Sequence, residues 1–154
     1  MPQSIKTQKN HRNSQDFMPE TQKRFKSWDL LHQLHRQSSL PWLCASDFNK
    51  ITRQSEKSGG RLHPHNQMQQ FRDVLDECGF MDLSFKGFPY TWSKHWQNGL
   101  SVWERLDRVV ASQKWFLEFP GTRVHHVDST TPDHNMLWID QADLEYQQKK
   151  NIYI

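Results

Sequence analysis

The sequence predicts an α/β fold in which a mixed β-sheet is flanked by helices, and three observations support this prediction. Short apolar stretches, typical of strands, are separated by turn-forming Gly, Pro, Asn and Asp residues. Two longer segments, 21–38 and 66–78, carry apolar residues at helical spacing. The elements follow one another in the order α-β-α-β-β-β-α-β-β, which is typical of α/β architecture.

The first helix is expected to begin at Thr21 and to end near residues 38–39, because Pro41 disfavours helical backbone at the residue before it. Its large apolar residues recur every three or four positions, as on the buried face of an amphipathic helix. These residues are Phe25, Trp28, Leu31 and Leu34.

The continuously apolar segment 41–45 is expected to form a strand that is buried on both faces. It delivers residues 46–49 to a loop, where open α/β sheets commonly bind ligands. In the second helix, Asn66 is expected to be the N-cap and Gln69 its capping-box partner. Gly79 suits the position just after that helix.

The second half of the chain predicts a hairpin, a short helix and several strands. The Asn-Gly pair at 98–99 indicates a hairpin turn between a strand at 90–92 and one that covers 101–110. Ser112 is expected to cap a short helix that ends at 120–121. The other predicted strands cover residues 80–83, 122–127 and the continuously apolar 136–139.

The composition is that of one small domain inside the cell. The chain has 154 residues, and its seven Trp and nine Phe supply large areas for burial. No apolar run approaches the roughly 18 residues of a membrane span, and the N-terminus has no apolar signal region. Cys44 and Cys78 are expected to be buried thiols, as in a reducing compartment. We therefore expect an intracellular protein, nuclear or cytoplasmic, that is not secreted.

The charges and the periodicity divide the chain into two tails and a domain. Residues 1–39 hold seven Lys or Arg and three Asp or Glu, which accounts for the formal net charge of +3. Residues 1–20 lack periodicity and are expected to be a disordered basic and polar tail. A domain over 21–140 and a polar tail over 141–154 are expected to follow. The basic tail is either a solvated segment or one that attracts phosphates non-specifically.

Asp47 and Asn49 follow the first predicted strand and are the first candidate site residues. If the backbone stays extended, the two side chains project to the same side. One carboxylate and one amide oxygen are hard ligands that suit Mg²⁺, whose other positions go to water and phosphate. Alternatively, Asp47 orients or deprotonates an attacking water while Asn49 positions a phosphate oxygen. The competing interpretation is a polar Asx-type turn that leaves a strand.

Asp107, Asp133 and His134 form the second candidate group. His134 can act as a cation or proton donor toward a phosphoryl oxygen, with Asp133 adjoining the metal. Asp107 can hydrogen-bond His134 and so fix the tautomer of the imidazole. The competing interpretation for Asp133-His134 is a polar turn, and for Asp107 it is an ion pair with Arg105 or Arg108.

Together, these motifs resemble the C-terminal half of the endonuclease/exonuclease/phosphatase superfamily, the DNase I-like fold. The likeness covers about residues 28–139 and points in particular to the endonuclease domain of plant LINE-type (non-LTR) retrotransposons. The segments that carry it are Pro41-Trp42-Leu43-Cys44, Ser46-Asp47-Phe48-Asn49, Glu56-Lys57-Ser58-Gly59-Gly60, 71–82, Tyr90-Thr91-Trp92, Trp103-Glu104-Arg105-Leu106-Asp107-Arg108 and the loop ending in Asp133-His134.

The resemblance implies a two-sheet sandwich flanked by helices and a Mg²⁺-dependent phosphodiester hydrolysis that nicks target DNA. It implies that Asp47 orients or activates the nucleophilic water and that Asn49 stabilises the developing phosphorane. Asp133 would contribute to the metal or base site, His134 would contact the scissile phosphate, and Asp107 would support His134. The implied metal ligands are Asp47, Asn49 and Asp133.

Several positions depart from the pattern of the family. Ser46 stands where the family has Gly, and Lys50 where a Glu is common, which places a cation beside the implied metal site. Pro132 replaces a Ser and removes both a hydroxyl and a backbone N–H. The family's N-terminal half supplies a metal-binding Asn and Glu and a phosphate-contacting Tyr, and residues 1–24 contain nothing that resembles it.

We therefore expect a truncated, inactive relic of a LINE-type nicking endonuclease, a pseudoenzyme fragment. One alternative is a nucleic-acid-binding or protein-interaction module that uses its basic N-terminal arm and its Trp-rich hairpin, and another is a weakly active nuclease. The apolar strands at 42–45 and 136–139 have no upstream half to cover them. One face of the sheet is thus expected to be exposed and to cause self-association.

Overall fold

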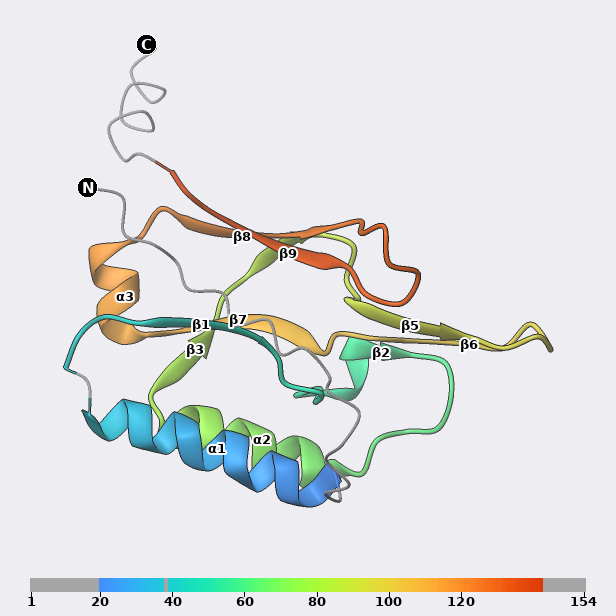
Figure 1. Ribbon diagram of the computed structural model, residues 1–154, viewed down its shortest axis with the longest axis horizontal. Coiled ribbons are helices and arrows are strands. Elements are labelled where there is room, and N and C mark those ends of the chain that lie inside the picture. The colour runs from blue at the N-terminus through green and yellow to red at the C-terminus, as the bar shows by residue number, and fades with distance from the viewer. Residues whose placement is uncertain (1–19, 38, 143–154) are drawn as a thin grey trace, which may run out of the picture. The chain divides into compact units, whose positions relative to one another are not determined.

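The computed structural model of the protein describes residues 20–37 and 39–142 (Figure 1). The chain divides into two compact units, residues 1–38 and 39–154. In the first unit, helix α1 runs from Glu20 to Gln37, which confirms the predicted first helix. The predicted tail over 1–20 lies outside the described residues except for its last residue, and the one over 141–154 except for its first two.

Residues 39–142 form a mixed α/β structure with three small sheets, each of three strands. The first sheet has the order β1 (Leu43–Asp47), β7 (Asp107–Ser112), β3 (Phe80–Asp82) and is antiparallel. The second has the order β2 (Lys57–Ser58), β6 (Ser101–Glu104), β5 (Trp92–His95) and is also antiparallel. The third has the order β4 (Phe85–Gly87), β8 (Thr122–Val127), β9 (Met136–Gln141), with β4 and β8 parallel. The α/β prediction is confirmed, but the single mixed sheet is wrong.

The first sheet lies between helix α2 (His65–Glu77) and the third sheet (Figure 1). On the side of the third sheet, Val109 and Ala111 of β7 pack with Leu83 and with Val124 of β8 in one buried apolar cluster. On the side of the helix, the fully buried Phe71 of α2 contacts the Phe48 ring. The first sheet is thus covered on both faces, contrary to the expectation that it lacks a partner sheet.

The outer strand β9 is not buried on both faces as predicted. Its side chains alternate, because Leu137 and Ile139 pack against the apolar cluster while Met136 and Trp138 point to solvent, 54% and 63% exposed. Such alternation is typical of an antiparallel strand with one solvated face. Strand β1 is likewise an edge strand whose apolar residues are only half-buried.

The predicted strand over 101–110 is interrupted after Glu104. The amide of Arg105 donates to the carbonyl of Glu56, and those of Leu106 and Asp107 donate to the Thr91 hydroxyl oxygen. Because these amides have left the strand ladder, the chain passes from the second sheet, as β6, to the first sheet, as β7.

The local signals for turns and helix ends succeeded in part. Gly99 has a positive φ in the β5–β6 hairpin, and Gly79 has one just after α2, both as predicted. Ser112 caps helix α3 (Gln113–Glu118) by accepting from the Trp115 amide. The capping box is wrong, since the N-cap of α2 is Pro64, two residues before the predicted Asn66, and makes no side-chain cap.

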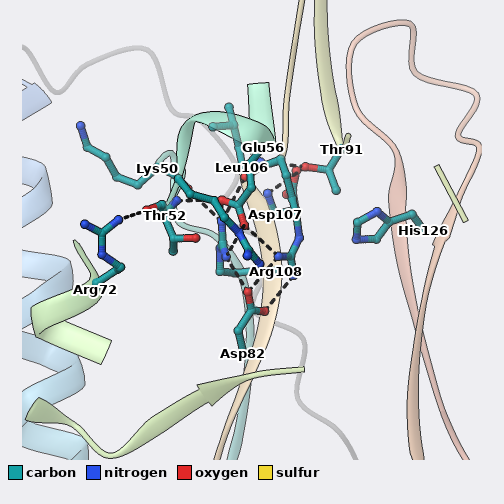
Figure 2. A network of polar contacts seen from close by, with 12 residues as sticks. Lys50, Thr52, Glu56, Arg72, Asp82, Thr91, Leu106, Asp107, Arg108 and His126 are labelled. Carbon is teal, nitrogen blue, oxygen red and sulfur yellow. Dashed lines mark hydrogen bonds and ion pairs between the residues drawn. The ribbon is translucent and has the colours of Figure 1, made fainter. Parts of the chain in front are cut away.

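A cluster of four charges lies where β6 leads into β7, and Figure 2 shows three of them, Glu56, Asp82 and Arg108. Glu56, Arg105 and Arg108 are buried, while the side chain of Asp82 is 27% exposed. The Arg105 guanidinium donates to both oxygens of Asp82 at 2.8 Å and to Glu56 at 3.1 Å. Arg108, which is fully buried, donates to Asp82 at 2.6 Å and to Glu56 at 2.7 Å. Glu56 ends the short helix η1 (Gln54–Glu56) before β2, so the cluster ties this segment to β3 and β7.

Glu56→Gln should lower the free energy of unfolding by about 3–5 kcal/mol, because it leaves buried guanidinium charge without its partner. The control is Arg123→Gln, which breaks the Arg123–Asp140 pair, and since that arginine is 43% exposed we expect a loss of only about 0–1 kcal/mol. Urea unfolding at neutral pH measures both. Equal losses would contradict a buried, structural role for the cluster.

The same variant tests the pH dependence. Burial raises the pKa of Glu56, but the hydrogen bond and charge of Arg108, the Thr52 amide and the charge of Arg105 together lower it to below its ordinary value of 4.5. A pKa that is lower in the folded than in the unfolded chain stabilises the fold above about pH 4.5, and this stability is lost as the pH falls through the folded value. The unfolding free energy of the unmodified chain should therefore fall more steeply in acid than that of Glu56→Gln.

Candidate functional site

The candidate site begins with two carboxylates on neighbouring strands. Asp47 is the last residue of β1 and Asp107 the first of β7, and the antiparallel register pairs them directly. Side chains that face each other in such a pair lie on the same side of the sheet. The predicted loop over 46–49 is thus corrected: Ser46 and Asp47 belong to the strand, and the sheet itself fixes the position of Asp47.

His134 completes a group of three. The loop that carries it forms an isolated bridge with Trp92, which leads into the hairpin. The imidazole Nδ1 lies 3.3 Å from Asp107 Oδ2, and one ligand atom from each of Asp47, Asp107 and His134 lies within 4.8 Å of the others. The predicted Asp107–His134 hydrogen bond is therefore present. The alternative ion pair is not, because both neighbouring arginines bond to Glu56 and Asp82 instead.

The electrostatics of the group centre on Asp107. Burial raises the pKa of its carboxyl group above the ordinary 3.8, and the negative charge of Asp47 raises it further. Hydrogen bonds from Thr91 and His134 lower it, but by less. A carboxylate that lies beside a second one is harder to ionise, because like charges repel.

Asp47 also makes the turn that the competing interpretation predicts. Its Oδ1 accepts from the Asn49 amide at 2.7 Å, and Asn49 has a φ of +53°. This is an Asx turn, in which Asn tolerates the left-handed conformation. The backbone is no longer extended at Asn49, so the argument that the side chains of Asp47 and Asn49 project to the same side fails.

Asp133 and Lys50 lie differently from their expected places. Asp133 is exposed and is not one of the three clustered residues, although its carbonyl oxygen accepts from the Ser93 amide. The Lys50 ammonium is buried and donates to Gln67 of α2 at 2.9 Å. This place differs from the one predicted from the sequence, which was beside the implied metal site.

The donor set does not fit Mg²⁺ on its own. Mg²⁺ requires near-octahedral oxygen coordination, and a typical site supplies one or two carboxylates that are free to bind it. Here one of the three donors is an imidazole nitrogen, and one oxygen of each carboxylate is hydrogen-bonded, Asp107 Oδ2 to His134 and Asp47 Oδ1 to the Asn49 amide. The arrangement can orient a histidine and accept protons, but these side chains make only part of a cation cage.

Thr91 is the supporting residue that the sequence argument missed. Its side chain is buried, and its Oγ1 accepts from the Leu106 and Asp107 amides at 3.0 and 2.9 Å (Figure 2). Its carbonyl accepts from the Asn135 amide at 2.8 Å. One residue thus contacts both the start of β7 and the His134 loop. A single threonine in a strand gives no sequence signal for such a role.

We find no match to this chain among models of protein families, and none among curated proteins. None of the helices in the described residues combines the length and the apolar character that crossing a bilayer requires.

Asp47→Asn should lower the pKa of Asp107 toward 3.8, because it removes the facing negative charge. The amide oxygen of the new Asn can still accept from the Asn49 amide, so the turn is preserved. Carboxyl-carbon NMR of the titrating chain measures the effect, with Asp76→Asn, an exposed site on α2, as the control. An unchanged Asp107 midpoint would show that the two carboxylates do not interact.

Proposed function

We propose that this chain is an inactive relic of a Mg²⁺-dependent, DNA-nicking endonuclease of the LINE retrotransposon type, built on part of a DNase I-like sandwich. The observation that carries the proposal is the Asp107–His134 pair beside Asp47. The order of the motifs along the chain supports it, and so does the packing of the first sheet against the third.

In such an enzyme, the histidine contacts a non-bridging oxygen of the scissile phosphate while the carboxylate behind it holds the ring in place. The second carboxylate, Asp47, would orient the attacking water. All three side chains come from the rim where β1 and β7 meet the His134 loop. The relic retains this orienting pair.

Hydrolysis should nevertheless stall. A phosphodiesterase must lower the barrier by at least about 8 kcal/mol, and the cation supplies a large electrostatic part of this. The donor set of Asp47, Asp107 and His134 does not by itself complete a Mg²⁺ site. We therefore propose no catalytic step through a metal.

A supercoiled-plasmid assay with Mg²⁺ tests the proposal. The expected result is no Mg²⁺-dependent nicking by the unmodified chain, and none by His134→Ala prepared in parallel. Nicking by the unmodified chain that is lost in His134→Ala would contradict the inactive relic and favour a working nuclease.

A nucleic-acid-binding module is the second candidate, and the tip of the β5–β6 hairpin favours it. Trp96 is 43% exposed there, and the Lys94 ammonium lies 5.2 Å from the centre of its ring. An exposed indole can stack on a base, which is worth about 1–3 kcal/mol, while a nearby cation meets the phosphate. In the same plasmid experiment, salt-dependent binding without cleavage that weakens in Trp96→Ala would support this candidate.

We also propose that the chain self-associates through the outer face of β8 and β9. This face exposes Val127, Met136 and Trp138, and β9 is an edge strand of its sheet. An exposed apolar face beside an open strand edge favours pairing with a second copy.

Sedimentation velocity over a range of concentrations tests the self-association. The unmodified chain should sediment faster as its concentration rises, and Trp138→Lys should reduce this trend because it places a charge on the face. The control is Leu117→Lys, which changes a similarly exposed residue on α3. A chain that stays monomeric throughout, or that responds equally to both substitutions, would contradict the proposed face.

A further inference from the structure

Asp107 lies within two residues of two buried arginines, yet its carboxylate bonds to neither of them in the contacts of the described chain. Its hydrogen-bond partner is His134 at 3.3 Å, and its amide donates to Thr91. An aspartate beside a guanidinium ordinarily forms a strong, often bidentate, ion pair. Two features of the structure keep Asp107 from pairing with Arg105 or Arg108.

The first is strand geometry, which separates Asp107 from Arg108. Successive residues of a strand point to opposite faces. Arg108 therefore points toward α2, where its guanidinium lies 5.5 Å from the Phe71 ring centre, while Asp107 points to the face of the third sheet. Arg105, which precedes the strand, is not constrained in this way.

The second reason is that the two arginines already have two carboxylates as partners. Asp82 and Glu56 each bond to both arginines, so that two cations meet two carboxylates (Figure 2). Even with these pairs, the Nε–H groups of Arg105 and Arg108 are buried and have no hydrogen-bond acceptor. A buried unpaired donor costs about 1–3 kcal/mol. Arg105, which strand geometry does not hold away from Asp107, would therefore gain from that carboxylate if one of the present two were removed.

We propose that Glu56 and Asp82 are positioning residues of the candidate site: by occupying Arg105, whose direction the strand does not fix, they leave the Asp107 carboxylate to His134. The role of the Asp107–His134 pair in a nuclease site rests on the proposed function, but the hydrogen bond itself can be measured without any enzymatic activity. The charges that shift the pKa of Asp107 agree with this arrangement, since after burial they come from Asp47 and His134.

Asp82→Asn is the main test, because Asp82 is the more accessible of the two carboxylates, with 27% of its side chain exposed against 7% for Glu56. The probe is NMR of the ring nitrogens of His134, assigned by comparison with His134→Ala. Asp107→Asn gives the position of the His134 Nδ1 signal when the pair is broken. Asp76→Asn, on the exposed face of α2, is the matched control.

The proposal predicts opposite results for removing an anion and removing a balanced pair. In Asp82→Asn, the His134 signal should move toward its position in Asp107→Asn, because a freed guanidinium draws the Asp107 carboxylate away. In the double variant Asp82→Asn with Arg105→Gln, one cation and one anion are gone, and the signal should return toward that of the unmodified chain.

A merely structural role for the cluster predicts that the double variant is disturbed at least as much as the single one. That outcome, or an unmoved signal in Asp82→Asn, would overturn the proposal. If Asp82→Asn does not fold, the charge-balanced double variant decides alone: an unmodified signal supports the proposal and a signal like that of Asp107→Asn overturns it. None of these results depends on nicking, so failure here is distinct from failure of the proposed function.

Discussion

The contact of the buried Arg105 and Arg108 with the buried Glu56 and the partly exposed Asp82 is the constraint on which the rest of the structure depends. It lies where the chain leaves the second sheet and enters the first, and it ties the η1–β2 segment to β3 and β7. Charges this deeply buried are tolerated only when they are paired and hydrogen-bonded. The crossover therefore has one favourable arrangement, and that arrangement determines where β7 begins.

The candidate site follows from this crossover. Because β7 begins at Asp107, the antiparallel register sets Asp107 opposite Asp47, and Thr91 holds both the start of β7 and the His134 loop. The site is thus assembled by backbone pairing and one buried hydroxyl group, and its three side chains are oriented by these contacts. The site lacks the full donor set of a metal site. The proposed function therefore combines an oriented histidine with the absence of hydrolysis.

Local signals in the sequence predicted local structure well. The extent of α1, the Asn-Gly turn of the β5–β6 hairpin and the Ser112 cap all depend on neighbours in the chain, and all are present. The Asp107–His134 bond was predicted as well, although 27 residues separate the partners. That prediction came from the order of the motifs and the family resemblance, since neither residue is distinctive alone.

Apart from the capping box of α2, the predictions that failed concern long-range pairing. The apolar runs at 41–45 and 136–139 read as doubly buried strands, but both β1 and β9 lie at sheet edges, where one face or one edge meets solvent. Nothing local marks the break after Glu104, because it arises from Glu56 and Thr91, which are distant in sequence. The partners of the arginines were missed for the same reason. The nearest carboxylate in the sequence is Asp107, but in the structure both arginines pair with Glu56 and Asp82, which are distant in sequence.

The most direct measurement of the central claim is anomalous diffraction from crystals of the unmodified chain soaked in Mn²⁺, which prefers the same oxygen ligands as Mg²⁺. The account predicts electron density in which Asp47, Asp107 and His134 lie together, with no ordered ion among them. An anomalous peak there, with a complete coordination sphere supplied by this chain and water, would contradict it.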